Sequence, residues 1–296
     1  MPTARGASAG QALDEGEGPA MTLRHIAVGV DGSVISVRAL DWAAAEAERH
    51  GVALRVLYAV ADRDEAAPVL RSAASRTRRR HPGLPVTTVA VEGGAVHALA
   101  RESAGADLTV VGTRGLGALT GTAFGSVGTR LAALARGPLL VVRGDHPCDD
   151  GRDVLLGLED DTDAEAAAYA FQEAERRGVR LRVVHSWSRR HITPELPSLV
   201  TARSPGQERP AREARAEEAV PRYALARLRD MHPDVVVDAR TVRAAPADVL
   251  LEATREAAVA VIGAHRRTSV FGPRLGPVAH VLMHRARCPV VLVPHG

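Results

Sequence analysis

The sequence contains one pattern twice, and this repeat constrains the fold more than any other feature. The stretch 106–143 matches 257–294 at a constant offset of 151 residues, so that Gly112 corresponds to Gly263 and Gly125 to Gly276. Upstream, 26–31 matches 154–159 at an offset of 128. A repeat of this length predicts two copies of one structural unit. The second copy is longer, and most of its additional residues fall in 188–230. The corresponding segment of the first copy is only 61–85, and we expect a short helix or a loop there.

Each copy alternates short apolar runs with longer stretches rich in Ala and Arg, which predicts a parallel α/β sheet. Runs such as 108–111 are apolar without alternation, as expected where helices cover both faces of a sheet. We therefore expect two tandem α/β domains, each an open, twisted, five-stranded parallel sheet of Rossmann-like type. In the first copy the expected strands are 26–30, 54–60, 86–91, 108–111 and 139–142, and the expected helices are 34–50, 95–104 and 126–135.

The length of 296 residues suits two domains of ordinary size, each with its own core. We expect a disordered tail at 1–22, a first domain at 23–145, a linker at 146–152 and a second domain at 153–296. No run approaches the ~18 apolar residues that a membrane span requires, and the tail has no apolar signal core. Two cysteines, Cys148 and Cys288, provide no disulfide framework. These features predict a cytoplasmic protein without a membrane partner.

All 38 basic residues are arginine, because the chain contains no lysine. This excludes a Walker lysine, Schiff-base chemistry and a lysine general base. A formal charge of +3 and a low content of aromatic residues argue against nucleic-acid binding, which favours clustered basic charge and stacking platforms. Any phosphate site must therefore use backbone amides, hydroxyl groups or arginine.

The strongest functional pattern follows the apolar run 108–111. It reads Gly112-Thr113-Arg114-Gly115, then nine residues, then Gly125-Ser126. A strand that leads through a glycine loop into a helix presents free backbone amides and a partial positive charge to a phosphate. The simpler alternative is a turn with Ser126 as a helix N-cap. The pattern matches neither the dinucleotide GxGxxG motif nor a Walker loop.

Several of these features together resemble the universal stress protein family in its tandem two-domain form. They are the segment Val28-Gly29-Val30-Asp31-Gly32-Ser33, the Ala106-Asp107-Leu108 lead into a strand, the glycine loop and the closing proline-apolar strand. The resemblance covers about 23–296. It implies an adenine-nucleotide alpha hydrolase-like fold that binds ATP, with or without Mg²⁺, at the carboxyl ends of the strands.

In this family the acid after the first strand contacts the nucleoside, the end of the second strand walls the adenine, and the glycine loop holds the phosphates. The resemblance therefore predicts a nucleotide site made of Val30, Asp31, Ala59, Gly112, Arg114, Gly115, Gly125, Ser126 and Val127. The sequence departs from the family pattern at one position of this loop. Family members often have a second Ser or Thr three residues after the last loop glycine, whereas this chain has Gly128 there and Thr129 one residue later.

The second copy departs further from the family pattern. Arg266 replaces the second loop glycine, Pro277 replaces the serine and removes a backbone N–H, and Glu159 replaces Asp31. We predict that this copy is degenerate, does not bind ATP and has a structural role. The last strands, 139–142 and 290–293, are expected to pair within the chain as a pseudo-dimer, and a homodimer is left open.

The sequence offers no clear catalytic residue and no carboxylate cluster for magnesium. His280 and His284 are four residues apart, but without a third ligand we interpret them as solvent-facing rather than metal-binding. Arg78-Arg79-Arg80-His81 is interpreted as a solvated face. The favoured function is a nucleotide-responsive stress regulator sensed by an unidentified protein partner. A slow adenine-nucleotide hydrolase and a ligand-free scaffold are the alternatives.

Overall fold

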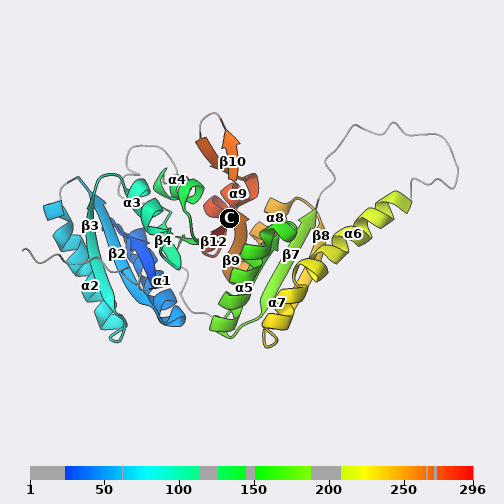
Figure 1. Ribbon diagram of the computed structural model, residues 1–296, viewed down its shortest axis with the longest axis horizontal. Helices are drawn as coiled ribbons and strands as arrows, with labels where there is room; N and C mark the ends of the chain where they lie inside the picture. The colour runs from blue at the N-terminus through cyan, green and yellow to red at the C-terminus, as the bar shows by residue number, and fades with distance from the viewer. Residues whose placement is uncertain are drawn as a thin grey trace, which may run out of the picture.

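The computed structural model describes residues 24–61, 63–113, 126–144, 151–187, 208–264, 266–269 and 272–295. These residues build one ten-stranded sheet with the strand order β3-β2-β1-β4-β5-β12-β9-β6-β7-β8, covered by helices (Figure 1). The strands of the first half are β1 His25–Gly29, β2 Ala53–Val60, β3 Val86–Glu92, β4 Leu108–Gly112 and β5 Leu139–Val142. Those of the second half are β6 Asp153–Leu158, β7 Leu181–Trp187, β8 Val237–Arg243, β9 Ala257–Ala264 and β12 Val290–Pro294.

Each half of the sheet has the same strand order and only parallel pairings, so the predicted tandem α/β fold is confirmed. The halves join where β5 pairs with β12 in antiparallel orientation, with Leu140 opposite Val291. The expected pairing of the two last strands within the chain is therefore present. It removes one exposed edge from each half, and the core strands at the join are buried.

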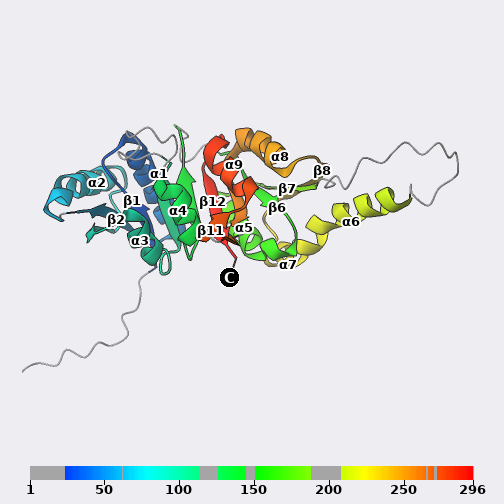
Figure 2. The same ribbon diagram turned by 90° about the horizontal axis from the view of Figure 1, so that it is seen from above.

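The helices form one layer on each face of the sheet (Figures 1 and 2). In the first half they are α1 Val34–His50, η1 Arg63–Ala66, α2 Ala67–Arg80, α3 Ala95–Glu102 and α4 Ser126–Leu134. In the second half they are η3 Asp161–Asp163, α5 Ala164–Arg177, α6 Glu208–Ala224, α7 Ala226–Met231, α8 Pro246–Ala253, η4 Thr254–Glu256 and α9 Pro277–Arg285. A short hairpin of β10 Arg266–Ser269 and β11 Gly272–Leu275 precedes α9.

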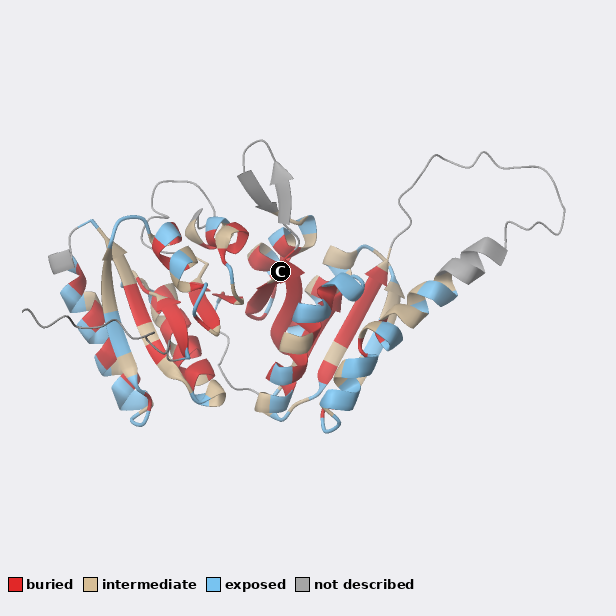
Figure 3. Cartoon of the chain, viewed as in Figure 1, coloured by how far each residue is buried: buried red, intermediate tan, exposed pale blue. Residues whose placement is uncertain are grey.

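Two hydrophobic cores run along the molecule, one on each face, and each continues from the first half into the second. One core packs α1, α2, α5, α6 and α7 against the sheet, and the other packs α3, α4, α8 and α9. Trp42 of α1 and Phe171 of α5 are the largest fully buried side chains. Figure 3 shows that buried residues concentrate along the central strands.

The ends of α1 and α5 follow directly from the local sequence. Ser33 caps α1 by accepting a hydrogen bond from the Ser36 backbone N–H. The two helices end at Gly51 and Gly178, which have φ angles of 64° and 62°. This left-handed conformation favours glycine, so both helices stop at equivalent places in the repeat.

The segment 61–85 of the first half contains a helix, so the loop alternative for it is wrong. Helix α2 has 14 residues and buries Leu70, Ala73, Ala74 and Thr77, which recur at helical spacing. Small and polar residues make up most of this buried stripe. The stripe was therefore hard to see in an arginine-rich sequence.

One hydroxyl group in each half ties the end of a helix to the turn before the last strand. Ser103 is 1% exposed, donates to the Ala100 carbonyl at 2.8 Å and accepts from the Arg136 backbone N–H at 3.0 Å. Thr254 has the same role in the second half and accepts from the Arg287 N–H at 2.9 Å. The repeat therefore preserves a buried polar connection as well as the strand order.

Candidate functional site

The predicted nucleoside-binding residues lie at the carboxyl ends of neighbouring strands. Gly29 of β1 is in register with Leu57 of β2, and Asp31 and Ala59 each lie two residues beyond that pair. Val30 is buried and donates its backbone N–H to the Leu57 carbonyl at 2.9 Å. On the other side of β1 lies β4, which ends at Gly112. The direction of strand order reverses between β1 and β4, where open α/β sheets form a crevice for ligands.

The turn after β1 orients the Asp31 carboxylate. Its Oδ1 accepts a hydrogen bond from the Ser33 backbone N–H at 3.0 Å, and Gly32 between them has a φ angle of 79°. This local hydrogen bond forms an Asx turn that leads into α1. Asp31 is therefore held at the strand end by the same turn that starts the helix.

Gly112 is required for packing, independently of any ligand. A Cβ atom at this position would lie 2.5 Å from Ile35 Cγ2 and 3.1 Å from the Ile35 carbonyl oxygen. The first turn of α1 therefore approaches β4 too closely for any side chain at position 112. In the second half a Cβ at Gly263 would overlap the side chains of Asp163 and His295, so side-chain atoms rather than a helix backbone lie against that glycine.

The start of α4 completes the described part of the predicted site. The helix begins at Ser126, and Val127 in its first turn is half-buried. Gly128 faces α9 across the join, since a Cβ there would lie 4.0 Å from Met283 Cε. The predictions for Arg114, Gly115, Gly125 and the side chain of Ser126 fall outside the described residues.

The equivalent turn of the second half carries four acids, Glu159, Asp160, Asp161 and Asp163. Glu159 is exposed and donates its backbone N–H to Asp163 Oδ2 at 2.6 Å, and the Asp163 side chain is buried. His295 Nε2 lies 3.3 Å from Asp163 Oδ1. At the start of α9, Gly276 is the N-cap and Pro277 occupies the first turn, with no side-chain cap. This turn presents more negative charge than its counterpart around Asp31.

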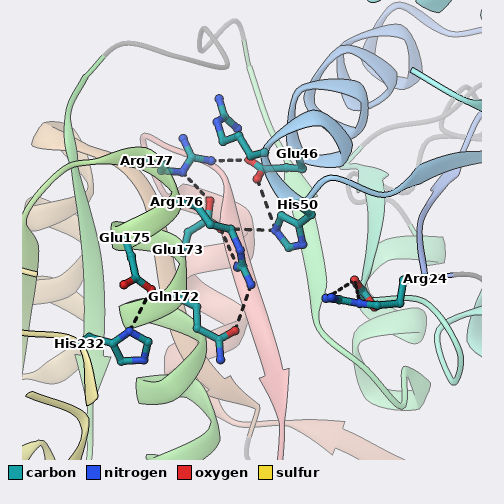
Figure 4. A network of polar contacts seen from close by, with 11 residues as sticks. Arg24, Glu46, His50, Gln172, Glu173, Glu175, Arg176, Arg177 and His232 are labelled. Carbon is teal, nitrogen blue, oxygen red and sulfur yellow. Dashed lines mark hydrogen bonds and ion pairs between the residues drawn. The ribbon is translucent and has the colours of Figure 1, made fainter. Parts of the chain in front are cut away.

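A buried polar cluster between the two halves escaped sequence reasoning (Figure 4). Near their C-terminal ends, α1 and α5 bring Glu46 and His50 opposite Glu173 and Arg177, and all four side chains are almost fully buried. Arg177 contacts Oε1 of both glutamates. The signal was present in the sequence, since Glu46-Ala47-Glu48-Arg49-His50-Gly51 recurs as Glu173-Ala174-Glu175-Arg176-Arg177-Gly178.

Burial and charge separate the two glutamates of this cluster. Burial and the nearby Glu173 carboxylate raise the pKa of Glu46 from 4.5 to about 7. Burial alone would also raise the pKa of Glu173, but His50 and Arg177 outweigh it and lower that pKa to about 2. The cluster therefore contains one carboxylate that favours its charged form and one that takes up a proton readily.

The remaining residues that the sequence singled out lie mostly on the surface. His280 is exposed and His284 half-buried, with ring centroids 4.4 Å apart, and partial burial with the nearby His280 and Arg143 lowers the pKa of His284. The arginines at 78–80 are exposed in the last turn of α2, as predicted. Cys288 is buried, and Cys148 lies outside the described residues. Among the described helices, none has the length and apolarity needed to span a bilayer.

Comparison with solved structures supports the fold. A functionally unknown protein from Pseudomonas aeruginosa PAO1 matches with a TM-score of 0.65 and 20% identity, over 92% of this chain and 93% of that one. A universal stress protein from Archaeoglobus fulgidus matches with a TM-score of 0.63 and 16% identity, over 92% of this chain and 96% of that one. At these identities the likeness concerns the fold.

Comparison of sequences gives the family. A universal stress protein of Mycolicibacterium smegmatis is 33% identical, covering 90% of this chain and 96% of that protein. One from Mycobacterium tuberculosis H37Rv is 31% identical, also covering 90% and 96%. The model of the universal stress protein family matches twice, at residues 22–143 and 152–294. With one match on each half of the ten-stranded sheet, the chain belongs to the universal stress protein family.

Proposed function

We propose that the first repeat binds an adenine nucleotide, ATP, and that the chain acts as a nucleotide-responsive stress regulator without robust catalytic activity. The observation that carries the proposal is the convergence of Asp31, Ala59 and Gly112 at the strand-order reversal. A carboxylate can accept hydrogen bonds from ribose hydroxyls, and the small Ala59 leaves room beside a base. The proposed domains span 23–145 and 153–296, joined by 146–152.

The phosphates in this proposal are held without lysine. Helix α4 begins at Ser126, and the first amides of a helix have no partners within the helix. These amides and the helix dipole favour an anion, and Arg114 is the cationic residue of the loop sequence. Mg²⁺ can accompany the triphosphate, but no step of the proposal depends on it.

The second repeat does not bind ATP in this proposal. The acids Glu159 and Asp163 bring negative charge to its strand ends, which disfavours a triphosphate. Pro277 removes a backbone donor from the first turn of α9. The second repeat instead supplies the strand β12 and the helix α5 that pack against the first. A protein partner of unknown identity senses the nucleotide state of the first repeat.

The deciding experiment is mass spectrometry of ligand released from freshly purified full-length protein, with ATP affinity measured by equilibrium dialysis. Gly115→Arg copies the residue at the matching position of the second repeat and is expected to abolish nucleotide binding. Pro277→Ser, in the second repeat, is the matched control and should leave the affinity unchanged. Absence of nucleotide at millimolar ATP, or equal binding by Gly115→Arg, would overturn the proposal.

A phosphate-release assay on the same samples separates binding from hydrolysis. The proposal predicts equilibrium binding without turnover. Steady phosphate release that Ser126→Ala abolishes would establish the slow hydrolase instead. If the protein neither binds nor hydrolyses ATP, its function is that of the ligand-free scaffold.

A further inference from the structure

Glu46 and His50 of α1 and Glu173 of α5 form a set of side chains that we call the inter-repeat cluster. One buried atom of each residue points to a common centre. His50 Nε2 lies 4.0 Å from Glu46 Oε2 and 3.7 Å from Glu173 Oε2, and one ligand atom of each residue lies within 4.8 Å of the other two. Such a triangle has a centre roughly 2–2.5 Å from each atom, close to the zinc–nitrogen and zinc–oxygen bond of about 2.0–2.2 Å.

The atoms that face this point lack hydrogen-bond partners. Among the described residues, none hydrogen-bonds to Glu46 Oε2, Glu173 Oε2 or either ring nitrogen of His50, and all of these atoms are buried. Buried polar atoms are normally satisfied by protein, water or an ion. Arg177 satisfies the opposite oxygen of each carboxylate and so leaves the inner oxygens available.

The arginines around the cluster lie on its outer side. Arg177 contacts Oε1 of both glutamates, and Arg49 donates to Glu46 Oε1 at 2.8 Å. Arg176 Nη1 lies 3.7 Å from Glu173 Oε2, which is too far for a hydrogen bond. These guanidinium groups compensate the two carboxylates, so a cation at this point would be held by the geometry of the inner ligand atoms and not by an excess of negative charge.

The repeat shows how the two sides of the cluster differ. His50 occupies the position that Arg177 holds in the second copy of the Glu-Ala-Glu-Arg motif. An arginine at position 50 would place a further buried guanidinium beside the inner oxygens of the two carboxylates. The histidine is shorter and substitutes a metal-binding nitrogen for that charge, so one half of a symmetric salt-bridge pair becomes a potential ligand set.

We propose that Glu46, His50 and Glu173 bind one zinc ion between the two repeats. One imidazole and two carboxylates suit Zn²⁺ better than Mg²⁺ or Ca²⁺, which favour larger sets of oxygen ligands. A water molecule provides the fourth position of a tetrahedral site. Because the ligands come from α1 and α5, bound zinc cross-links the two halves.

Zinc binding is tested on the full chain after chelator treatment, with Zn²⁺ alone as the probe. The background variant is His280→Gln with His284→Gln, which removes a pair of neighbouring imidazoles outside the cluster, so that any zinc bound is not bound there. Equilibrium dialysis at pH 7.5 should give one zinc per chain and a raised thermal midpoint. Co²⁺ should give the intense visible absorption of a tetrahedral site.

His50→Arg is the decisive variant, because it introduces the residue of the second repeat and replaces the imidazole ligand with a guanidinium, which does not bind metal. This variant should fold and bind zinc ~100-fold or more weakly. Loss of a residue that only supports a metal ligand typically costs about 10–100-fold in affinity, and loss of a ligand itself should cost at least as much. Glu173→Gln should also lose zinc and serves if His50→Arg fails to fold. Glu48→Gln removes a carboxylate of the same helix outside the cluster and should bind zinc normally.

Two results would overturn the assignment. One is zinc binding by His50→Arg or Glu173→Gln with the affinity of the background protein. The other is no zinc uptake and no change in thermal midpoint at 10-fold excess zinc over protein, which would mean that the cluster takes up only a proton. Neither result bears on nucleotide binding in the first repeat, so this test is independent of the proposed function.

Discussion

Replacing Ser103 with alanine should destabilise the first repeat by about 1–3 kcal/mol, the cost of leaving a buried donor without a partner. The variant removes the acceptor of the Arg136 backbone N–H, at 3.0 Å, and the donor to the Ala100 carbonyl, at 2.8 Å. The site is 1% exposed, so water cannot readily replace the lost hydroxyl. Adjacent to it, a Cβ at Gly137 would lie 2.6 Å from the Ser103 carbonyl oxygen, so the turn has little freedom to adjust.

The assay is urea unfolding followed by tryptophan fluorescence in a Trp187→Phe background, so that the buried Trp42 reports on the first repeat. With a urea dependence of about 2 kcal/mol per molar, the midpoint should fall by roughly 0.5–1.5 M at unchanged slope. Ser103→Thr is the matched control, because Thr254 performs the same role in the second half. Ser75→Ala, at an exposed position of α2, gives the effect of removing a hydroxyl that makes no buried contact.

Unfolding of Ser103→Ala at the same urea concentration as Ser75→Ala would contradict this prediction. An equal loss of stability in Ser103→Thr and Ser103→Ala would contradict it as well. Either result would mean that the buried hydroxyl contributes nothing specific, and that the recurrence of this contact in both halves has no energetic consequence.

Three further predictions concern packing, the join and pH. Gly112→Ala should cost about 1–3 kcal/mol by overpacking against α1, whereas Gly83→Ala, with open space around it, should not; equal urea midpoints would contradict this. Leu140→Asp buries an unpaired charge opposite β12 and should cost more than about 4 kcal/mol, seen as loss of cooperative thermal unfolding; a normal transition would disprove the join. Because the pKa of Glu46 is raised, the folded state binds its proton more tightly than the unfolded state does. With chelator present, the free energy of unfolding should therefore fall as the pH rises from about 4.5 to about 7. The lowered pKa of Glu173 has the opposite effect, so its contribution to stability is lost as the pH falls from about 4.5 to about 2. Glu46→Gln should remove the fall in the urea midpoint between pH 5 and 7.5, and a fall that persists would assign it to another group.

Local sequence patterns predicted most of the elements. The apolar runs of the first copy became strands within one residue of their expected ends, and α1 spans the expected 34–50. Caps such as Ser33 and Gly51 explain this accuracy, because they act on adjacent residues. The alignment of Asp31 with Ala59 also follows from the sequence, since parallel strands end at one edge. The nucleotide-binding roles of all nine predicted site residues stay predictions.

The repeat by itself determined that the chain has two copies of one α/β unit and that their last strands are apolar enough to pair. Only the tertiary structure decided that α1 approaches β4 so closely at Gly112, and that Glu46 and Glu173 face each other across 127 positions of sequence. The physical reason is distance along the chain. Propensity, periodicity and caps act between near neighbours, whereas the burial of a charge or the clash of a Cβ depends on which distant surfaces meet.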